Sequence, residues 1–265
     1  RTSSMSGTKT AWRGLLLLSI LALSAPGPAA AQVSSADQIC APTTDPCVVS
    51  SATQVVSGAM LDFGDRALVI TASGRLISAG GAITIFARQM QMDPSSQINL
   101  RGTTSTPGGS LDASIDQTFS LAGTVDATGN GGGSVNVTAT RLDVDGSGRF
   151  LVNGINADSS GGDVDISADE INFGSGSTLG LTGGAQSTGG TLTMAATSML
   201  TIGGVVDASG GDADGGLMDI EAGGLLEISS TALVRANGGL SGSGGEISIS
   251  AGDSFMGSGQ GDLVM

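Results

Sequence analysis

The stretch Gly132-Gly133-Ser134-Val135-Asn136-Val137-Thr138-Ala139 decides the fold of this chain, because it recurs along the sequence at a nearly constant spacing. A pair of glycines is followed by a segment in which apolar and polar residues alternate. The mean interval between successive pairs is about 27 residues, and repetition at such a period predicts a stacked array of equivalent units. The other six copies begin at Gly80-Gly81, Gly108-Gly109, Gly161-Gly162, Gly189-Gly190, Gly215-Gly216 and Gly244-Gly245.

Each unit contains two further short alternating segments, such as Leu142-Asp143-Val144 and Val206-Asp207-Ala208. Alternation with a period of two predicts strands with one buried face. Three short strands per unit predict an all-β fold, a single-stranded, right-handed parallel β-helix of about 7–8 turns over residues 61–265. An antiparallel β-sandwich is the alternative, but it would not place a glycine pair at one strand in every three.

The repeats also predict which residues stack inside the β-helix. One inward column is Val135, Val164, Leu192, Met218 and Ile247, and the next is Val137, Ile166, Met194, Ile220 and Ile249. Five phenylalanines fall at core positions, and Phe86 falls at an outward position. The five are Phe63, Phe119, Phe150, Phe173 and Phe255.

The first 31 residues have the features of a secretory signal peptide. An uncharged apolar run, 14–25, follows Lys9 and Arg13 and precedes Ala29-Ala30-Ala31. The run is too short to cross a bilayer, and we expect export without a membrane span. Because Met5 opens a conventional leader, residues 1–4 are expected to precede the native start.

Beyond the leader, residues 32–60 are predicted to form an N-terminal cap. Cys40 and Cys47 are seven residues apart in the exported part, where an oxidising compartment favours a local disulfide. At the other end the chain stops at Met265, part-way through a unit, so we expect a truncated β-helix with an uncapped end that associates end to end.

Composition excludes several classes of function. The formal net charge is −14, which excludes a basic surface for nucleic acid. The chain has no His, and its only Lys is Lys9 in the leader. Catalytic Ser-His-Asp, Cys-His and Ser-Lys arrangements are therefore excluded, and few side chains remain that could bind zinc. The set of Lys, Arg and often His beside an acidic cluster on which pectin-cleaving β-helices rely cannot be assembled here either, and the sequence predicts no enzyme and no cofactor.

Pairs of carboxylates are the only catalytic groups that the composition leaves open. Asp143/Asp145, Asp163/Asp165 and Asp212/Asp214 are the candidates for glycoside hydrolysis, but alternate acids on an outward strand are ordinarily solvated. The turn that contains Asp212 and Asp214 also resembles one repeat of a calcium-binding nonapeptide array. Since that period is not sustained, we interpret both acids as exposed turn residues, with calcium binding as the alternative.

The leader, the Cys40…Cys47 segment, Leu61-Asp62-Phe63-Gly64 and the repeated glycine-pair units with Val125-Asp126-Ala127 and Val206-Asp207-Ala208 together resemble a family. They are similar to bacterial secreted β-helix proteins of the filamentous-haemagglutinin and autotransporter-passenger kind. The resemblance implies export to the cell surface and a structural or adhesive role against a host, a neighbouring cell or a matrix polymer. The alternative is a β-helix that binds or cleaves polysaccharide, with its site in the loops after the third strand or beyond Met265.

Overall fold

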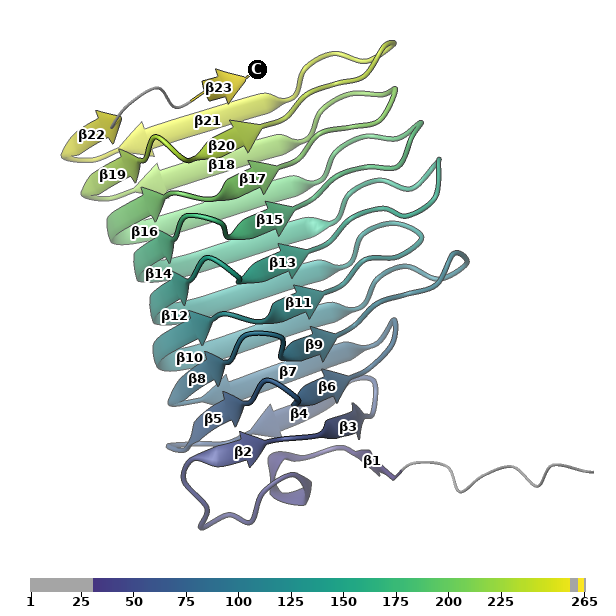
Figure 1. Ribbon diagram of the computed structural model, residues 1–265, viewed down its shortest axis with the longest axis vertical. Coiled ribbons are helices and arrows are strands. Elements are labelled where there is room, and N and C mark those ends of the chain that lie inside the picture. The colour runs from purple at the N-terminus through teal and green to yellow at the C-terminus, as the bar shows by residue number, and fades with distance from the viewer. Residues whose placement is uncertain (1–30, 258–261, 265) are drawn as a thin grey trace, which may run out of the picture. The chain divides into compact units, whose positions relative to one another are not determined.

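The computed structural model describes residues 31–257 and 262–264, so the predicted signal peptide lies outside the described residues except for Ala31. The described chain is a β-solenoid of about 8 turns with about 27 residues per turn. In Figure 1 the near strands run from left to right and the far strands return from right to left as the chain rises, so the coil is right-handed. The predicted parallel β-helix is confirmed.

The strands form two long parallel sheets. The ten-stranded sheet follows the order β1 (Gln32–Val33), β3 (Ala52–Val55), β6 (Arg75–Ile77), β9 (Gln97–Asn99), β11 (Thr124–Asp126), β13 (Arg149–Leu151), β15 (Thr178–Gly180), β17 (Val205–Asp207), β20 (Leu233–Arg235) and β23 (Asp262–Val264). The thirteen-stranded sheet contains β2 (Cys47–Val49), β4 (Ala59–Asp62), β5 (Ala67–Ile70), β7 (Ala82–Ala87), β8 (Gln89–Met92), β10 (Ser110–Leu121), β12 (Ser134–Val144), β14 (Asp163–Phe173), β16 (Thr191–Ile202), β18 (Leu217–Ala222), β19 (Leu225–Ile228), β21 (Glu246–Ala251) and β22 (Ser254–Gly257).

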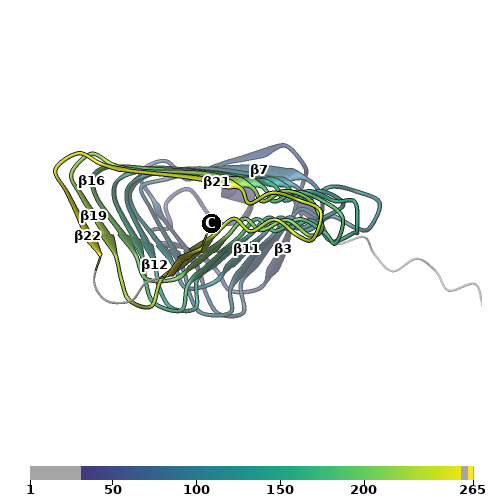
Figure 2. The same cartoon turned by 90° about the horizontal axis from the view of Figure 1, so that it is seen from above.

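The first and second strands of the middle coils are continuous, which differs from the three short strands predicted. In β12 the inward–outward alternation slips once, where Thr140 and Arg141 both face outward. Two successive outward residues turn the chain around a corner while its ladder to the neighbouring strand continues on both sides. The bend in β12 and β16 is visible when the stack is seen from above (Figure 2).

The predicted inward columns are confirmed in register. Val135 pairs with Val164 and Val137 with Ile166, and all four are at most 2% exposed. Phe119, Phe150 and Phe173 also stack in the interior, with ring centres 6.4 and 6.3 Å apart. Each coil therefore buries its apolar side chains against the coils above and below it.

Phe255 was predicted to be a core residue and is 57% exposed. It is in register with the fully buried Leu226, so its slot was identified correctly. No described side chain covers it on the far side of β22. A core side chain is shielded from water only when a coil lies on each side of it.

The glycine pairs mark the place where the outgoing and returning segments of a coil pinch together, seen as the narrow extension on the right of Figure 2. The N–H of Gly133 donates to the carbonyl of Ala127 in the same coil at 2.7 Å. A Cβ on Gly133 would lie 1.9 Å from the carbonyl oxygen of Gly109, and one on Gly132 would lie 1.9 Å from that of Val152. Backbone packed this closely from both sides requires glycine at both positions.

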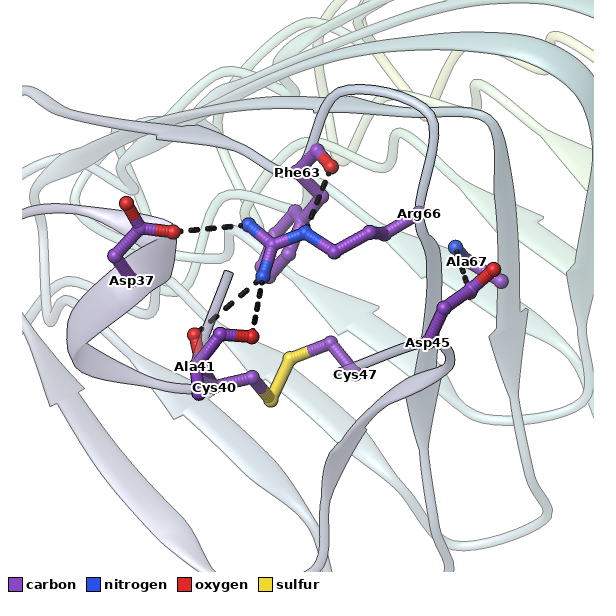
Figure 3. The surroundings of a disulfide bond; sticks show 8 residues. All are labelled: Asp37, Cys40, Ala41, Asp45, Cys47, Phe63, Arg66 and Ala67. Carbon is purple, nitrogen blue, oxygen red and sulfur yellow. Dashed lines mark hydrogen bonds and ion pairs between the residues drawn. A yellow bond between two sulfur atoms is a disulfide. The ribbon is translucent and has the colours of Figure 1, made fainter. Parts of the chain in front are cut away.

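The segment predicted as a cap already contributes strands to the solenoid. Within 32–60, β1 and β3 join the ten-stranded sheet and β2 joins the other, so coil formation begins before residue 61. The short 3₁₀ helix η1 (Ala36–Gln38) and the loop that follows it pack against the first coil. Ala36 is 2% exposed there, and Cys40 is joined to Cys47 by a disulfide (Figure 3).

Arg66 holds this N-terminal segment in place. Its guanidinium donates to the carbonyl oxygens of Phe63, Cys40 and Ala41 and to a carboxylate oxygen of Asp37, at 3.0–3.4 Å (Figure 3). The Arg66 side chain is only 13% exposed. One buried cation therefore satisfies the loop's backbone acceptors and fastens the loop to the first coil.

Candidate functional site

The outward face of the second strand in each coil carries polar side chains of several kinds, and we call it the second-strand face. Ladder register places two columns on it. One column is Gln89, Thr118, Arg141, Glu170, Met199 and Leu225, and the other is Gln91, Ser120, Asp143, Asn172, Thr201 and Glu227. Amide, hydroxyl, guanidinium and carboxylate groups thus follow one another along the axis at the coil spacing of about 4.8 Å.

Arg141 is the centre of this face. Its Nε and Nη2 donate to the two carboxylate oxygens of Asp143 at 2.7 and 2.9 Å, and its Nη1 donates to Glu170 at 2.5 Å. The hydrogen bonds and charge of Asp143 raise the pKa of the Arg141 guanidinium; burial opposes them, and Glu170 adds to the rise. Arg141 therefore stays protonated and is oriented by its two partners.

This cluster was not anticipated from the sequence. The stack places Arg141 between Asp143 and Glu170. Asp143 lies on the same strand as Arg141, but Glu170 comes from the next coil, 29 residues later. Only the ladder register could have predicted the second contact.

Three shallow hollows adjoin the second-strand face. The largest, of about 640 Å³, lies along the corner between the first and second strands and is lined by Gln117, Thr118, Thr140, Arg141, Asp169, Glu170, Thr197 and Ser198. Two smaller hollows of about 360 and 300 Å³ are lined in part by Gln91 and Ser120. The face is thus uneven over several coils, and it exposes hydrogen-bond donors and acceptors.

Within the largest hollow several groups already bond to one another. Thr197 donates through its hydroxyl to a carboxylate oxygen of Asp169 at 2.8 Å, and Ser198 donates to the Asp169 carbonyl at 2.7 Å. Gln89 donates to the side-chain oxygen of Gln117 at 2.8 Å. These contacts between coils fix the orientation of exposed side chains before any ligand arrives.

The carboxylate pairs predicted from the sequence lie in different settings. Asp163 and Asp165 are exposed at alternate positions of β14, as expected. Asp143 is held by Arg141, and the Asp145 side chain accepts the backbone N–H of Ser147 at 3.0 Å, closing a turn. None of these arrangements pairs a free acid with a free base across a hollow.

Asp212 and Asp214, the calcium candidates, are both exposed at the tip of a glycine loop and line a hollow there with Gln186 and Ser241. The Asp214 carboxylate accepts the backbone N–H of Ser243 in the next coil at 2.6 Å. Within residues 31–257 and 262–264, no group of three or more acidic, Cys or His side chains could hold a metal ion. The Asp214 carboxylate therefore links two coils.

A partly buried ion pair joins two coils in the C-terminal half of the stack. Arg235 donates to Asp207 at 2.6 Å, and Asp207 is 8% exposed. Burial raises the pKa of the Asp207 carboxyl, but hydrogen bonds from Arg235 and from the side chain and backbone of Ser209 outweigh it, so the net pKa lies below the ordinary value. The folded state therefore favours the charged carboxylate.

Comparison with known protein families, with curated proteins and with solved structures found no significant match. None of the helices in the described part of the chain is long and apolar enough to cross a membrane. The fold thus defines the class, a parallel β-solenoid, and what the protein does is argued from its surface.

Proposed function

We propose that this protein is a secreted or cell-surface structural rod of the adhesin-like kind, without catalytic activity. The observation that carries the proposal is the uninterrupted stack of coils that presents the second-strand face as a rigid, prearranged polar ladder. Rigid side chains lose little entropy on binding, so an extended stack suits attachment through many weak contacts. The signal peptide predicted from residues 1–31 supports export.

Two features favour binding over catalysis. Arg141 is protonated and engaged by two carboxylates, so it is a poor general base, and Asp143 accepts two hydrogen bonds from it. The partner is a polymer at a host, neighbouring-cell or matrix surface, and end-to-end association of the rod adds valency.

The test is an adhesion assay with beads that carry the chain from Gln32 to Met265. Retention on bacterial, host-cell or matrix-coated surfaces, lost on heating the protein past its unfolding transition, is expected. Equal retention of beads that carry heat-unfolded protein would contradict a role for the folded rod.

Polysaccharide binding on the second-strand face is the second candidate. Hydroxyl-rich sugars are recognised by planar amides, guanidinium and carboxylates, and the hollow around Arg141 and Glu170 offers all of these groups within four coils. A glycan array would separate the two functions. Binding that is lost in Arg141→Leu and kept in Arg149→Leu favours polysaccharide, and release of new reducing ends would overturn the non-catalytic assignment.

A further inference from the structure

Three Asn-Gly pairs occur in the described chain, and all three lie in the loops between the third strand and the next glycine pair. They are Asn130-Gly131, Asn153-Gly154 and Asn237-Gly238. An asparagine before glycine is chemically vulnerable, because the glycine has no side chain to hinder attack of its backbone nitrogen on the asparagine amide. The three sites differ in the hydrogen bonds that the glycine nitrogen and the asparagine amide form.

At Asn153 the fold blocks the reaction at the attacking nitrogen. The N–H of Gly154 donates to the carbonyl of Thr182 at 2.9 Å, so the nucleophilic nitrogen is held by the neighbouring coil. The side-chain oxygen of Asn153 accepts the backbone N–H and the hydroxyl of Thr182 at 2.8 and 3.0 Å. The amide oxygen of Asn153 therefore has two donors, but the nitrogen that would attack the amide is engaged by the next coil.

At Asn130 the attacking nitrogen is not engaged in this way. Asn130 is exposed, and the N–H of Gly131 has no hydrogen-bond acceptor among residues 31–257 and 262–264. Gly131 has a φ of +86° and open space where a Cβ would be, so the peptide has room to move. The nitrogen is available for attack.

The side-chain oxygen of Asn130 is also bound by two donors from the next coil. Asn156 donates through Nδ2 at 3.0 Å, and Ser159 donates through its hydroxyl at 2.7 Å. Negative charge develops on this oxygen when a nucleophile adds to the amide carbon. Two donors aimed at it act as an oxyanion hole and stabilise the transition state.

We propose that Asn130 is a site of spontaneous deamidation built by the fold. The Gly131 nitrogen bonds to Cγ of Asn130, the Cγ–Nδ2 bond breaks, and the amide nitrogen leaves as ammonia with the proton of the Gly131 N–H. Water then opens the five-membered succinimide at one of its two carbonyl carbons and yields aspartate or isoaspartate. The surface near the loop tip gains a negative charge with time.

Asn237 lies between the two extremes. It is half-buried, its side chain makes no hydrogen bond among the described residues, and the N–H of Gly238 has no acceptor there. Its nitrogen is available but its amide has no oxyanion donors. The folded protein should therefore deamidate fastest at Asn130, more slowly at Asn237 and slowest at Asn153.

The experiment incubates the folded, exported chain in warm, mildly alkaline buffer and follows the three sites by peptide mass spectrometry. Ser159→Ala should slow the reaction at Asn130 by about two- to tenfold, the equivalent of one neutral hydrogen bond. The matched control is Ser160→Ala, because the Ser160 hydroxyl bonds to Ser187 and not to Asn130. In urea the three rates should converge, since only the fold distinguishes the sites.

Three results would overturn the proposal. These are a rate at Asn130 no higher than at Asn153 in the folded protein, an unchanged rate in Ser159→Ala, and the same order of sites in urea as in the folded state. A Ser159→Ala variant that fails to fold would not hide the outcome, because the folded and urea-treated parent protein tests the order of sites by itself.

Discussion

The two ends of the stack differ in how well their inward side chains are shielded from water. At the N-terminal end η1 and the disulfide loop cover the first coil, so that Ala36 and Cys47 are at most 2% exposed. At the C-terminal end Ile247 and Ile249 are only partly buried, and Phe255 is 57% exposed. An inward side chain is thus protected by its neighbours and not by its own coil, as expected for a solenoid in which each repeat contacts only adjacent repeats.

The largest effect should separate the middle of the stack from its C-terminal end. Ile166→Asp places an unpaired carboxylate in a fully buried column and should lower the free energy of unfolding by about 3–5 kcal/mol. Ile249→Asp makes the same chemical change in the same column, three coils later, where the side chain reaches water. Urea unfolding of both variants measures the difference, and equal losses would show that the last coil is as dry as the middle.

Removing the disulfide should make the N-terminal end resemble the other one. The Cys40→Ala/Cys47→Ala double variant should lose about 2–3 kcal/mol of stability, the value expected for opening so short a loop. Its uncovered strand edge should also increase concentration-dependent association in light scattering. A variant that melts with the parent protein and scatters no more would mean that the loop covers the coil without its covalent bond.

Loss of Arg66 tests the non-covalent part of the same cover. Arg66→Met keeps the length of the side chain but leaves the carbonyls of Cys40 and Ala41 without their donor, which should cost about 1–2 kcal/mol. Hydrogen exchange should quicken in 36–46 before it does elsewhere. The control is Arg149→Met, because Arg149 is exposed and forms no ion pair within the described residues. If both variants exchange alike, Arg66 does not fasten the loop.

Acid should destabilise the C-terminal half of the stack by protonating Asp207. This is the smallest of the four expected effects on stability. Because the folded pKa of Asp207 lies below its unfolded value, the carboxylate stabilises the fold above the ordinary carboxyl pKa of about 3.9. That contribution is lost as the pH falls through this value toward the folded pKa.

The comparison for this prediction is Asp207→Asn, which cannot titrate. The difference in Tm between parent and variant should shrink between about pH 6 and about pH 2.5. A difference that stays constant over that interval would show that the charge on Asp207 contributes nothing to stability.

Much of the fold could be predicted from the sequence because one physical rule repeats. Alternation at Val135 and Val137 identifies an inward face, and the constant spacing of glycine pairs places Val164 and Ile166 beside them. The corner at Thr140 and Arg141 could not be predicted, since a slip of one residue in the alternation looks the same whether a strand bends or ends.

The candidate site was harder to predict for a related reason. The contact of Arg141 with Glu170 and that of Arg66 with Asp37 join residues 29 positions apart. The periodicity predicts the column to which a side chain belongs. The rotamer of that side chain and its hydrogen-bond partner depend on the charged residues of the adjacent coils. Composition shows which charged side chains are present, and it does not show where they meet.

The direction of the ladder hydrogen bonds has a mechanical consequence. They all run from one coil to the next, so tension along the axis loads the coil boundaries in series and stretches each bond along its own length. The boundary at the C-terminal end has 13 paired residues (six, four and three), as many as a middle boundary (ten and three), whereas the first boundary has 10 (three, three and four). Under a steady pull the rod should tear first at its N-terminal boundary.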